Sequence, residues 1–233
     1  MAWKVQRFVT CGLAVLFCLQ LSIVWTCRAN QDADLNPTQQ ASLKSAEQVY
    51  NVADQAHKGG DESSALRGYA VALKEFMPLA KQGDPEAELY LGKMYYLGQG
   101  VLKEPDEAIK WFEASAEQGN AEAQFFLGTI YYLPHKDIAQ GLKWLRLSAE
   151  QGNQDAQLLL GQAYLQDFKD LPFDPVQADM WLRLAARNNL PFYTGQLQAA
   201  EKGMNAYQIA KGRMLAKAWK PKAGLRPTAD LPK

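Results

Sequence analysis

Hydrophobic and small residues recur along the middle of the chain with the spacing of helices that bury one face. One stretch places them at positions i, i+4, i+7 and i+8, as Ala87, Leu91, Met94 and Tyr95. The next stretch shows the same kind of spacing, in Ala108, Trp111, Phe112, Ser115 and Ala116. Side chains at such intervals lie on one side of an α-helix, so each stretch is predicted to be an amphipathic helix.

The two stretches recur three times in the same order. The pattern Ala-(x)3-Leu-Gly-(x)2-Tyr of the first stretch begins at Ala87, Ala123 and Ala156. The second stretch carries a tryptophan, at Trp111, Trp144 and Trp181. Helical pairs that repeat every 33 to 37 residues stack side by side and share one continuous core. The sequence therefore predicts an all-α solenoid of helix–turn–helix repeats, with the three tryptophans in its core.

Residues typical of helix ends separate the stretches. In Gly83-Asp84-Pro85, glycine suits the end of one helix, aspartate caps the next helix, and proline suits its first turn. Glycine also recurs inside the first helix of each repeat, at Gly92, Gly128 and Gly161. Because glycine costs a helix about 0.5–1 kcal/mol relative to alanine, its recurrence indicates close approach of a neighbouring helix.

Flanking segments extend the array of three clear repeats. Residues 46–56 and 65–83 are expected to form a degenerate N-terminal repeat, because the second segment ends with the same Ala-x-Gln-Gly motif. Residues 194–201 and 205–219 are expected to form C-terminal capping helices. The last of these is predicted to bury one face, which carries Tyr207, Ala210, Met214, Leu215 and Ala218.

These segments divide the chain into four parts. Residues 1–29 are predicted to be a signal peptide, and residues 30–45 a flexible polar spacer. The solenoid is expected to span residues 46–219. Residues 220–233 form a basic, proline-containing tail that is expected to fray.

The repeats resemble the Sel1-like repeat family, which is related to the tetratricopeptide repeats. The first full repeat carries most of that pattern: Ala87, Leu91-Gly92, Tyr95, Gly98-Gln99-Gly100-Val101, Asp106, Ala108, Trp111 and Ala116-Glu117-Gln118-Gly119. The second repeat departs from the pattern at Pro134–Asp137, and the third inserts Phe168–Phe173. The ending from Gln208 to Trp219 also resembles the closing helix of exported bacterial members. The resemblance implies a right-handed α-solenoid that binds peptides or folded proteins as a scaffold, and it names no substrate.

The N-terminal segment has the features of a secretory signal. Lys4 and Arg7 precede an uncharged run at residues 8–27, and Cys27-Arg28-Ala29 offers small residues at a cleavage site. The protein is therefore expected to be exported, to the periplasm or outside the cell. The alternative is an uncleaved inner-membrane anchor with the repeats facing the periplasm, because about 20 uncharged residues are enough to span a bilayer.

No residue is singled out as catalytic, cofactor-binding or metal-binding. The three cysteines, Cys11, Cys18 and Cys27, all lie in the signal segment. His57 and His135 have no nearby serine, carboxylate pair or second histidine at ligand spacing and are interpreted as surface residues. The balance of 25 basic against 25 acidic residues gives no indication of a nucleic-acid partner. We therefore predict a non-enzymatic protein without a cofactor or small-molecule substrate, whose partner is a protein or peptide.

Residues opposite the core side of the first helices are the candidate partner-binding residues. At about 100° per residue, two columns form along the stacked repeats, Leu89/Phe125/Leu158 and Tyr96/Tyr132/Leu165, with Lys93 between them. The columns either line a concave groove for a peptide or pack against neighbouring repeats as core. The core alternative is favoured for the first column, and the two alternatives are equal for the tyrosines. The candidate groove residues are Tyr96, Tyr132, Lys93, Leu89, Phe125 and Leu165.

The C-terminal end is basic. Residues 202–233 carry a net charge of +7 and residues 30–201 a net charge of −10. A solvated cap explains this end most simply. The alternative is that it docks an envelope-attached structural protein onto anionic lipid or cell-wall polymer.

Overall fold

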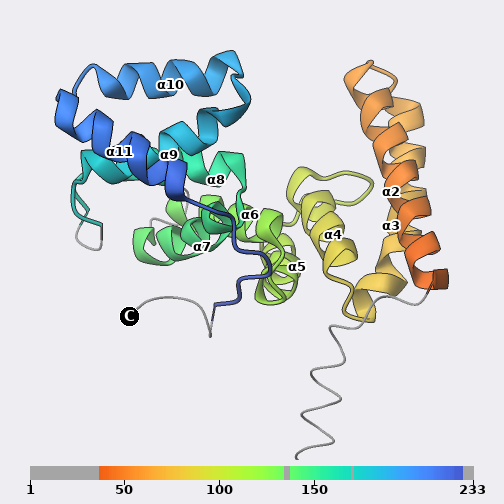
Figure 1. Ribbon diagram of the computed structural model, residues 1–233. Coiled ribbons are helices and arrows are strands. Elements are labelled where there is room, and N and C mark those ends of the chain that lie inside the picture. The colour runs from red at the N-terminus through yellow and green to blue at the C-terminus, as the bar shows by residue number, and fades with distance from the viewer. Residues whose placement is uncertain (1–36, 134–136, 169–170, 228–233) are drawn as a thin grey trace, which may run out of the picture. The chain divides into compact units, whose positions relative to one another are not determined.

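The computed structural model describes residues 37–133, 137–168 and 171–227. The predicted signal peptide, the first part of the predicted spacer and His135 lie outside the described residues. The chain from Leu43 onward forms one compact unit, and the contacts below are within it. The helices of the described part follow in chain order (Figure 1): α2 (Pro37–Lys58), α3 (Glu62–Lys81), α4 (Pro85–Leu97), α5 (Pro105–Glu117), α6 (Ala121–Tyr132), α7 (Ile138–Gln151), α8 (Gln154–Ala163), α9 (Pro175–Ala185), α10 (Pro191–Glu201) and α11 (Ala206–Ala218).

Helices pack in hairpins, and the hairpins stack in chain order. The two helices of each clear repeat contact one another: α4 with α5, α6 with α7, and α8 with α9. We call the first helix of each repeat the A helix and the second the B helix. Each B helix also contacts the A helix of the next repeat. Among the described residues the sole β contact is an isolated bridge between Phe168 and Leu171, so the predicted all-α solenoid is confirmed.

Side-chain caps fix where the A helices begin. Asp84 accepts a hydrogen bond from the backbone N–H of Ala87, and Asn120 and Asn153 cap α6 and α8 in the same way. Such caps satisfy N–H groups that have no partner inside the helix. The recurring Gly-Asp/Asn junction of the sequence therefore sets the start of every A helix in the three clear repeats.

The glycines inside the A helices are the points of closest approach to the B helices. A Cβ atom at Gly92 would lie 2.6 Å from the ring of Phe112, and one at Gly128 would lie 2.7 Å from Leu145. This confirms the role predicted for these glycines. Trp144 and Trp181 are buried as predicted, and Trp111 is partly buried against the first core cluster.

The predicted spacer is wrong in its second part. Helix α2 begins at Pro37 and not near Ala46, so residues 37–45 are helical. Proline suits the first turn of a helix, and Leu43 packs against the core cluster of the first hairpin. The polar residues of this segment therefore form the exposed side of an amphipathic helix.

The predicted buried face of the last helix is also wrong. Tyr207 is 69% exposed and Met214 is 61% exposed, whereas Gly212 and Ala216 are the buried residues of α11. Helix α11 packs on α9, and a Cβ at Gly212 would clash with the side chain of Asp179. Of the predicted face, Leu215 does pack against the core cluster of the second and third repeats, but the tightest contact with α9 is made by the small residue Gly212.

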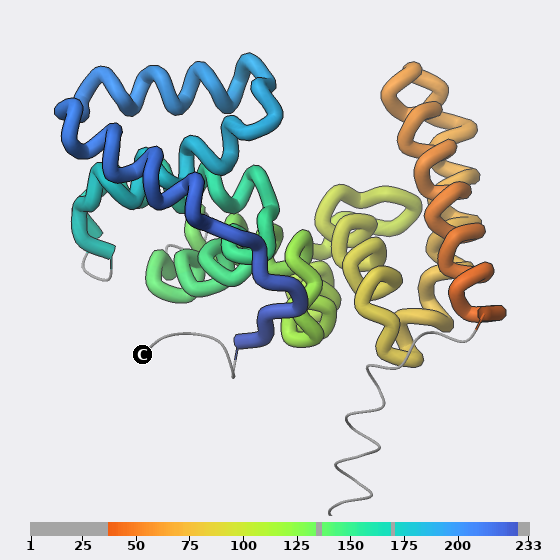
Figure 2. The backbone as a smooth tube through the Cα atoms, viewed as in Figure 1, coloured from red at the N-terminus to blue at the C-terminus, as the bar shows by residue number. Residues whose placement is uncertain are grey.

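The expectation that the tail frays is wrong for residues up to Leu225. Beyond α11 the chain continues without another helix, as the dark blue tube in Figure 2 shows. Leu225 is 8% exposed and belongs to the core cluster of the first two repeats. None of the described helices is long and apolar enough to span a membrane.

Candidate interaction surfaces

The structure places Leu89 in the core and not on a surface. Its side chain is 1% exposed and packs in a cluster with Phe112 and Ala123. Leu158, its equivalent in the third repeat, is buried as well. Leu89 therefore has to be removed from the predicted set of partner-binding residues, because α4 turns this position toward the next repeat.

Phe125 and Leu165 are partly buried. Phe125 packs against the cluster of the second and third repeats, and its ring centroid lies 5.7 Å from that of Phe126. Leu165 packs against the cluster that joins α8, α9 and α10. Both residues support their own repeats, and each leaves part of its side chain accessible.

Tyr96 and Tyr132 are half-buried, and their hydroxyls form no hydrogen bond with a described residue. The ring of Tyr96 meets Phe112 edge-on at 6.3 Å between centroids, and the Nζ of Lys103 lies 5.7 Å from the Tyr96 centroid. Tyr132 meets Phe168 edge-on at 6.0 Å, and burial raises the pKa of its hydroxyl. The two tyrosines pack against different core clusters, so each ring is held by a different part of the solenoid.

Lys93 joins the first two clear repeats. Its Nζ lies 2.7 Å from Oε1 of Glu122 on α6. The same Nζ lies 5.0 Å from the ring centroid of Tyr90 and 5.8 Å from that of Phe126. Burial, followed by the charges of nearby carboxylates, raises the pKa of Tyr90 to about 12. The predicted binding lysine therefore holds a contact between repeats in this structure, with its side chain 15% exposed.

The sequence analysis missed the aromatic residues that stack between repeats. Phe76 of α3 stacks on Tyr90 of α4 at 4.6 Å, and Phe112 of α5 stacks on Phe126 of α6 at 4.8 Å. Tyr90 and Phe126 both lie three residues after the first alanine of their repeat. An aromatic residue at this position in two repeats is the sequence feature that could have indicated the stacking.

Glutamine side chains form a second regular surface where B helices end and A helices begin. Gln118 donates to the carbonyl of Gly83 at 3.0 Å and to Glu88 at 2.8 Å. One repeat later, Gln151 donates to the carbonyl of Gly119 at 3.0 Å and to Gln124 at 2.8 Å. We call this surface the glutamine edge; its residues are Gly83, Glu88, Gln118, Gly119, Gln124, Gln151, Gly152 and Gln157.

Within this edge, Glu88 occupies a position at which the next two repeats have glutamine. Gln124 and Gln157, its equivalents, donate to the carbonyls of Ala116 and Ala149. A carboxylate has no proton to donate. Burial, the largest cause, raises the pKa of Glu88 to about 7; the charge of Asp84 acts in the same direction, and the hydrogen bond from Gln118 opposes them.

The C-terminal segment lies on the glutamine edge. The backbone N–H of Gly224 donates to Oε1 of Gln151 at 2.7 Å, and the carbonyl of Leu225 accepts from Nε2 of Gln124 at 2.7 Å. The backbone N–H of Lys222 donates to the carbonyl of Glu150 at 2.9 Å, and its Nζ lies 2.6 Å from Oε2 of Glu150. A non-helical segment of the chain, bent at Ala223 and Gly224, is thus held against two repeats.

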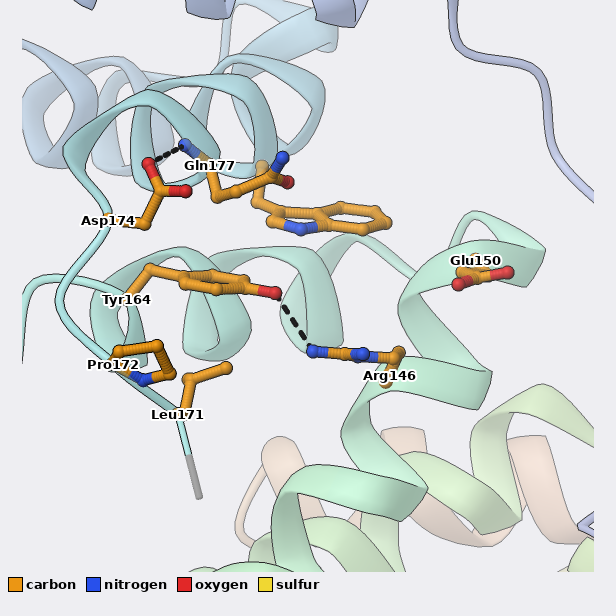
Figure 3. Close-up of a pocket in the computed structure, with 8 residues that line it drawn as sticks. Arg146, Glu150, Tyr164, Leu171, Pro172, Asp174 and Gln177 are labelled. Atoms are coloured by element: carbon orange, nitrogen blue, oxygen red, sulfur yellow. Dashed lines mark hydrogen bonds between the residues drawn. The ribbon is translucent and has the colours of Figure 1, made fainter. Parts of the chain in front are cut away.

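A pocket of about 360 Å³ lies between the second and third clear repeats (Figure 3). Its lining residues come from α7, α8, α9 and the loop before α9: Arg146, Glu150, Tyr164, Leu171, Pro172, Asp174, Gln177 and Trp181. Arg146 donates to the hydroxyl of Tyr164 at 2.9 Å, and Asp174 caps α9. These groups do not form a nucleophile–base pair, and the described part of the chain holds no cluster of three metal-binding side chains.

Stacked helix hairpins define this protein as an α-solenoid. Three consecutive Sel1 repeats match residues 85–120, 121–153 and 154–190, and these ranges coincide with the hairpins α4–α5, α6–α7 and α8–α9. Residues 85–190 of the chain therefore carry three Sel1 repeats, and the resemblance to the Sel1-like repeat family is confirmed. Proteins of this family are generally scaffolds for protein–protein interaction.

Two solved structures support the same assignment. An SLR-fold protective antigen present in uropathogenic Escherichia coli strains aligns with 28% identity and a TM-score of 0.57. A Sel1 repeat protein from Oxalobacter formigenes aligns with 26% identity and a TM-score of 0.54. The alignments cover 77% and 66% of this chain but 40% and 62% of those chains, so this chain spans less than two thirds of either relative. No curated protein matches the chain significantly.

Proposed function

We propose that this protein is an exported, non-enzymatic scaffold that binds a segment of another protein across the A helices of its first two clear repeats. The observation that carries the proposal is the state of Tyr96 and Tyr132. Both rings are anchored by aromatic neighbours, and both hydroxyls are without a hydrogen bond to a described residue. Tyrosines of this kind offer a rigid apolar ring and a polar tip to a partner at a small cost in side-chain entropy.

The neighbourhood of these tyrosines supports a protein partner over a small molecule. Lys103 and Phe126 lie next to the Tyr96 ring, and the Nζ of Lys93 lies 5.8 Å from the ring centroid of Phe126. A surface that mixes half-buried aromatic rings with charged side chains is typical of protein interfaces. The regular repeat also places Tyr96 and Tyr132 at equivalent positions, which suits an extended partner segment.

Site-specific crosslinking tests the proposal. A photo-crosslinking residue at position 96 of the full chain is expected to form a discrete adduct in the envelope, whereas the same residue at exposed position 207 is not. With the crosslinked partner purified, Tyr96→Ala combined with Tyr132→Ala should weaken binding by about 30-fold, since truncation of interface tyrosines costs about 2 kcal/mol or more. Tyr207→Ala is the control. Wild-type affinity in the double variant would exclude this face.

Export is a separate part of the proposal. It is supported by the basic start, apolar run and small-residue cleavage site of residues 1–29. Cell fractionation with N-terminal sequencing is expected to find a mature chain that starts near Asn30 in the periplasmic or secreted fraction. A cytoplasmic chain that retains Met1 contradicts export, and a membrane-bound chain that retains it supports the anchored alternative.

The structural alternative, docking of the basic C-terminal end onto lipid or cell-wall polymer, has less support. Lys222 is paired with Glu150, and the segment around it lies on the repeats. Sedimentation of the full chain with anionic liposomes, before and after Lys217, Lys220 and Arg226 are changed to glutamine, separates the two functions. A loss of sedimentation in the variant would favour the alternative.

A further inference from the structure

The segment from Lys220 to Leu225 is bound in the manner of a peptide ligand. Its backbone groups exchange hydrogen bonds with side-chain amides of Gln124 and Gln151, and such bonds do not depend on the side chains of the segment. One side chain, that of Leu225, is buried, while residues 220–224 are exposed. Backbone recognition combined with one apolar anchor is a common mode of peptide binding.

The glutamine edge allows the backbone of the segment to approach closely. Gly119 lies beneath the segment, and a Cβ at this position would come within 3.0 Å of the carbonyl group of Gly224. Gly119 is therefore required for the segment to lie so near. A Cβ at Gly152, one repeat later, would lie 3.7 Å from the Cβ of Pro221, an ordinary van der Waals contact. Two successive repeats thus offer a glycine where the segment passes.

The same edge is open in the first clear repeat. Gly83 is the equivalent of Gly119, and a Cβ built there meets no described atom within 4 Å. Gln118 and Glu88 occupy the positions of Gln151 and Gln124. The glycine and Gln118 therefore recur in the first clear repeat, but Glu88, which is 5% exposed, stands in place of the donor Gln124, so the full set of binding features is confined to the part of the edge that the segment covers.

The bound segment shows which chemistry the edge accepts. Lys222 pairs with Glu150, and Leu225 fills an apolar site three residues later. Gly224 has a φ of 66°, a left-handed conformation that glycine adopts far more readily than other residues. The edge thus selects a lysine, a spacer residue, a glycine and a leucine in that order.

We propose that the part of the glutamine edge formed by the hairpins α4–α5 and α6–α7 is a peptide-binding site, which residues 220–225 occupy as an internal ligand. Its external ligand is a non-helical segment of a partner protein with the Lys-x-Gly-Leu chemistry, which bends at the glycine as residues 222–225 do and binds by displacing the tail. This site is separate from the tyrosines of the A helices, so either site stands if the other fails.

A competition experiment on the full chain tests the proposal. The probe is a fluorescein-labelled peptide with the sequence of residues 218–227. Leu225→Asp should release the internal ligand, because a carboxylate disfavours the apolar site. Fluorescence anisotropy is expected to show the peptide binding this variant about tenfold more tightly than wild type, since a tethered competitor acts at millimolar effective concentration.

Matched variants define the site. Leu102→Asp changes a leucine that is 81% exposed and should bind the peptide as wild type does. Adding Gln124→Ala to Leu225→Asp should remove most of the gain, and a peptide that carries Asp in place of its leucine should not bind. Circular dichroism and the thermal midpoint establish that each variant is folded.

Two results would overturn the proposal. One is equal binding of the peptide to wild type and to Leu225→Asp, including no binding to either. The other is a concentration-dependent dimer of the wild-type chain that exchanges tails, because the ligand would then be a second copy. Hydrogen exchange on wild type provides a measurement that needs no variant. Excess unlabelled peptide should accelerate exchange in residues 219–225, and unchanged protection would contradict displacement.

Discussion

Replacement of Glu88 by glutamine should stabilise the protein at neutral and alkaline pH. Glu88 is 5% exposed and stands where the next two repeats have Gln124 and Gln157. The amides of those residues each donate to a backbone carbonyl eight positions earlier, a bond that ionised Glu88 cannot make. Glu88→Gln restores the donor toward Ala80, and its side-chain oxygen still accepts from Gln118.

The direction of the pH effect follows from the pKa of Glu88. In the folded chain this pKa is raised from 4.5 to about 7, mainly by burial. Between these values the folded state binds more protons than the unfolded state, so stability is highest below pH 4.5 and falls as the pH rises toward 7. The full shift corresponds to about 3 kcal/mol at 1.36 kcal/mol per unit. Screening at the edge of the repeats reduces the expected loss to about 2 kcal/mol.

Urea denaturation of wild type and Glu88→Gln at pH 5 and pH 8 measures this effect. The variant should gain about 2 kcal/mol in the free energy of unfolding at pH 8 and less than about 0.5 kcal/mol at pH 5. Glu117→Gln, an exposed change on α5, should alter neither value. An equal effect of Glu88→Gln at both pH values would refute the reasoning, because the gain would then not depend on ionisation.

Two further predictions concern packing and a buried ion pair. A Cβ at Gly141 would lie 2.6 Å from the backbone nitrogen of Tyr132, so Gly141→Ala should lower the free energy of unfolding by about 2–3 kcal/mol. A Cβ at Gly195 meets no atom within 4 Å, so the control Gly195→Ala should be neutral or slightly stabilising in thermal denaturation. Asp179 is fully buried and paired with a guanidinium group at 2.8 Å, so Asp179→Ala should cost about 3–5 kcal/mol. On α5, Lys110 and Glu107 form an ion pair at 2.8 Å in which the lysine side chain is 70% exposed. Glu107→Ala should change the free energy of unfolding by less than about 1 kcal/mol; similar losses for Asp179→Ala and Glu107→Ala would contradict the second prediction.

Much of the fold follows from local patterns. The repeat of alanine, Leu-Gly and tryptophan specifies helix pairs, and the Gly-Asp/Asn junctions specify where A helices begin, so both were predictable. The sequence does not reveal how closely two particular helices approach. Gly141 occupies the position of Ala108 and Ala178, and that equivalence suggests that alanine is tolerated there. Only the contact of α7 with the backbone at Tyr132 shows that it is not.

Prediction failed at the ends because hydrophobicity alone does not decide which side of a terminal helix is covered. In α11 the large side chains of Tyr207 and Met214 are exposed, and Gly212 forms the contact. The partner of this contact is the buried Asp179 of α9, a polar residue that an apolar pattern does not identify. Because no repeat follows α11, its buried side is determined by its packing against α9 alone.

The candidate binding residues were predictable as positions but not as surfaces. Helical periodicity places Leu89, Lys93 and Tyr96 on one side of α4, yet the structure buries the leucine, pairs the lysine and leaves the tyrosine half accessible. What separates them is the next repeat, which covers Leu89 and supplies Glu122 to Lys93. The glutamine edge shows the same dependence on tertiary structure. In the sequence its amides are ordinary polar residues at helix ends, and nothing there indicates that a segment about 100 positions away lies across them. Binding in a solenoid is therefore a property of adjacent repeats and not of a motif within one repeat.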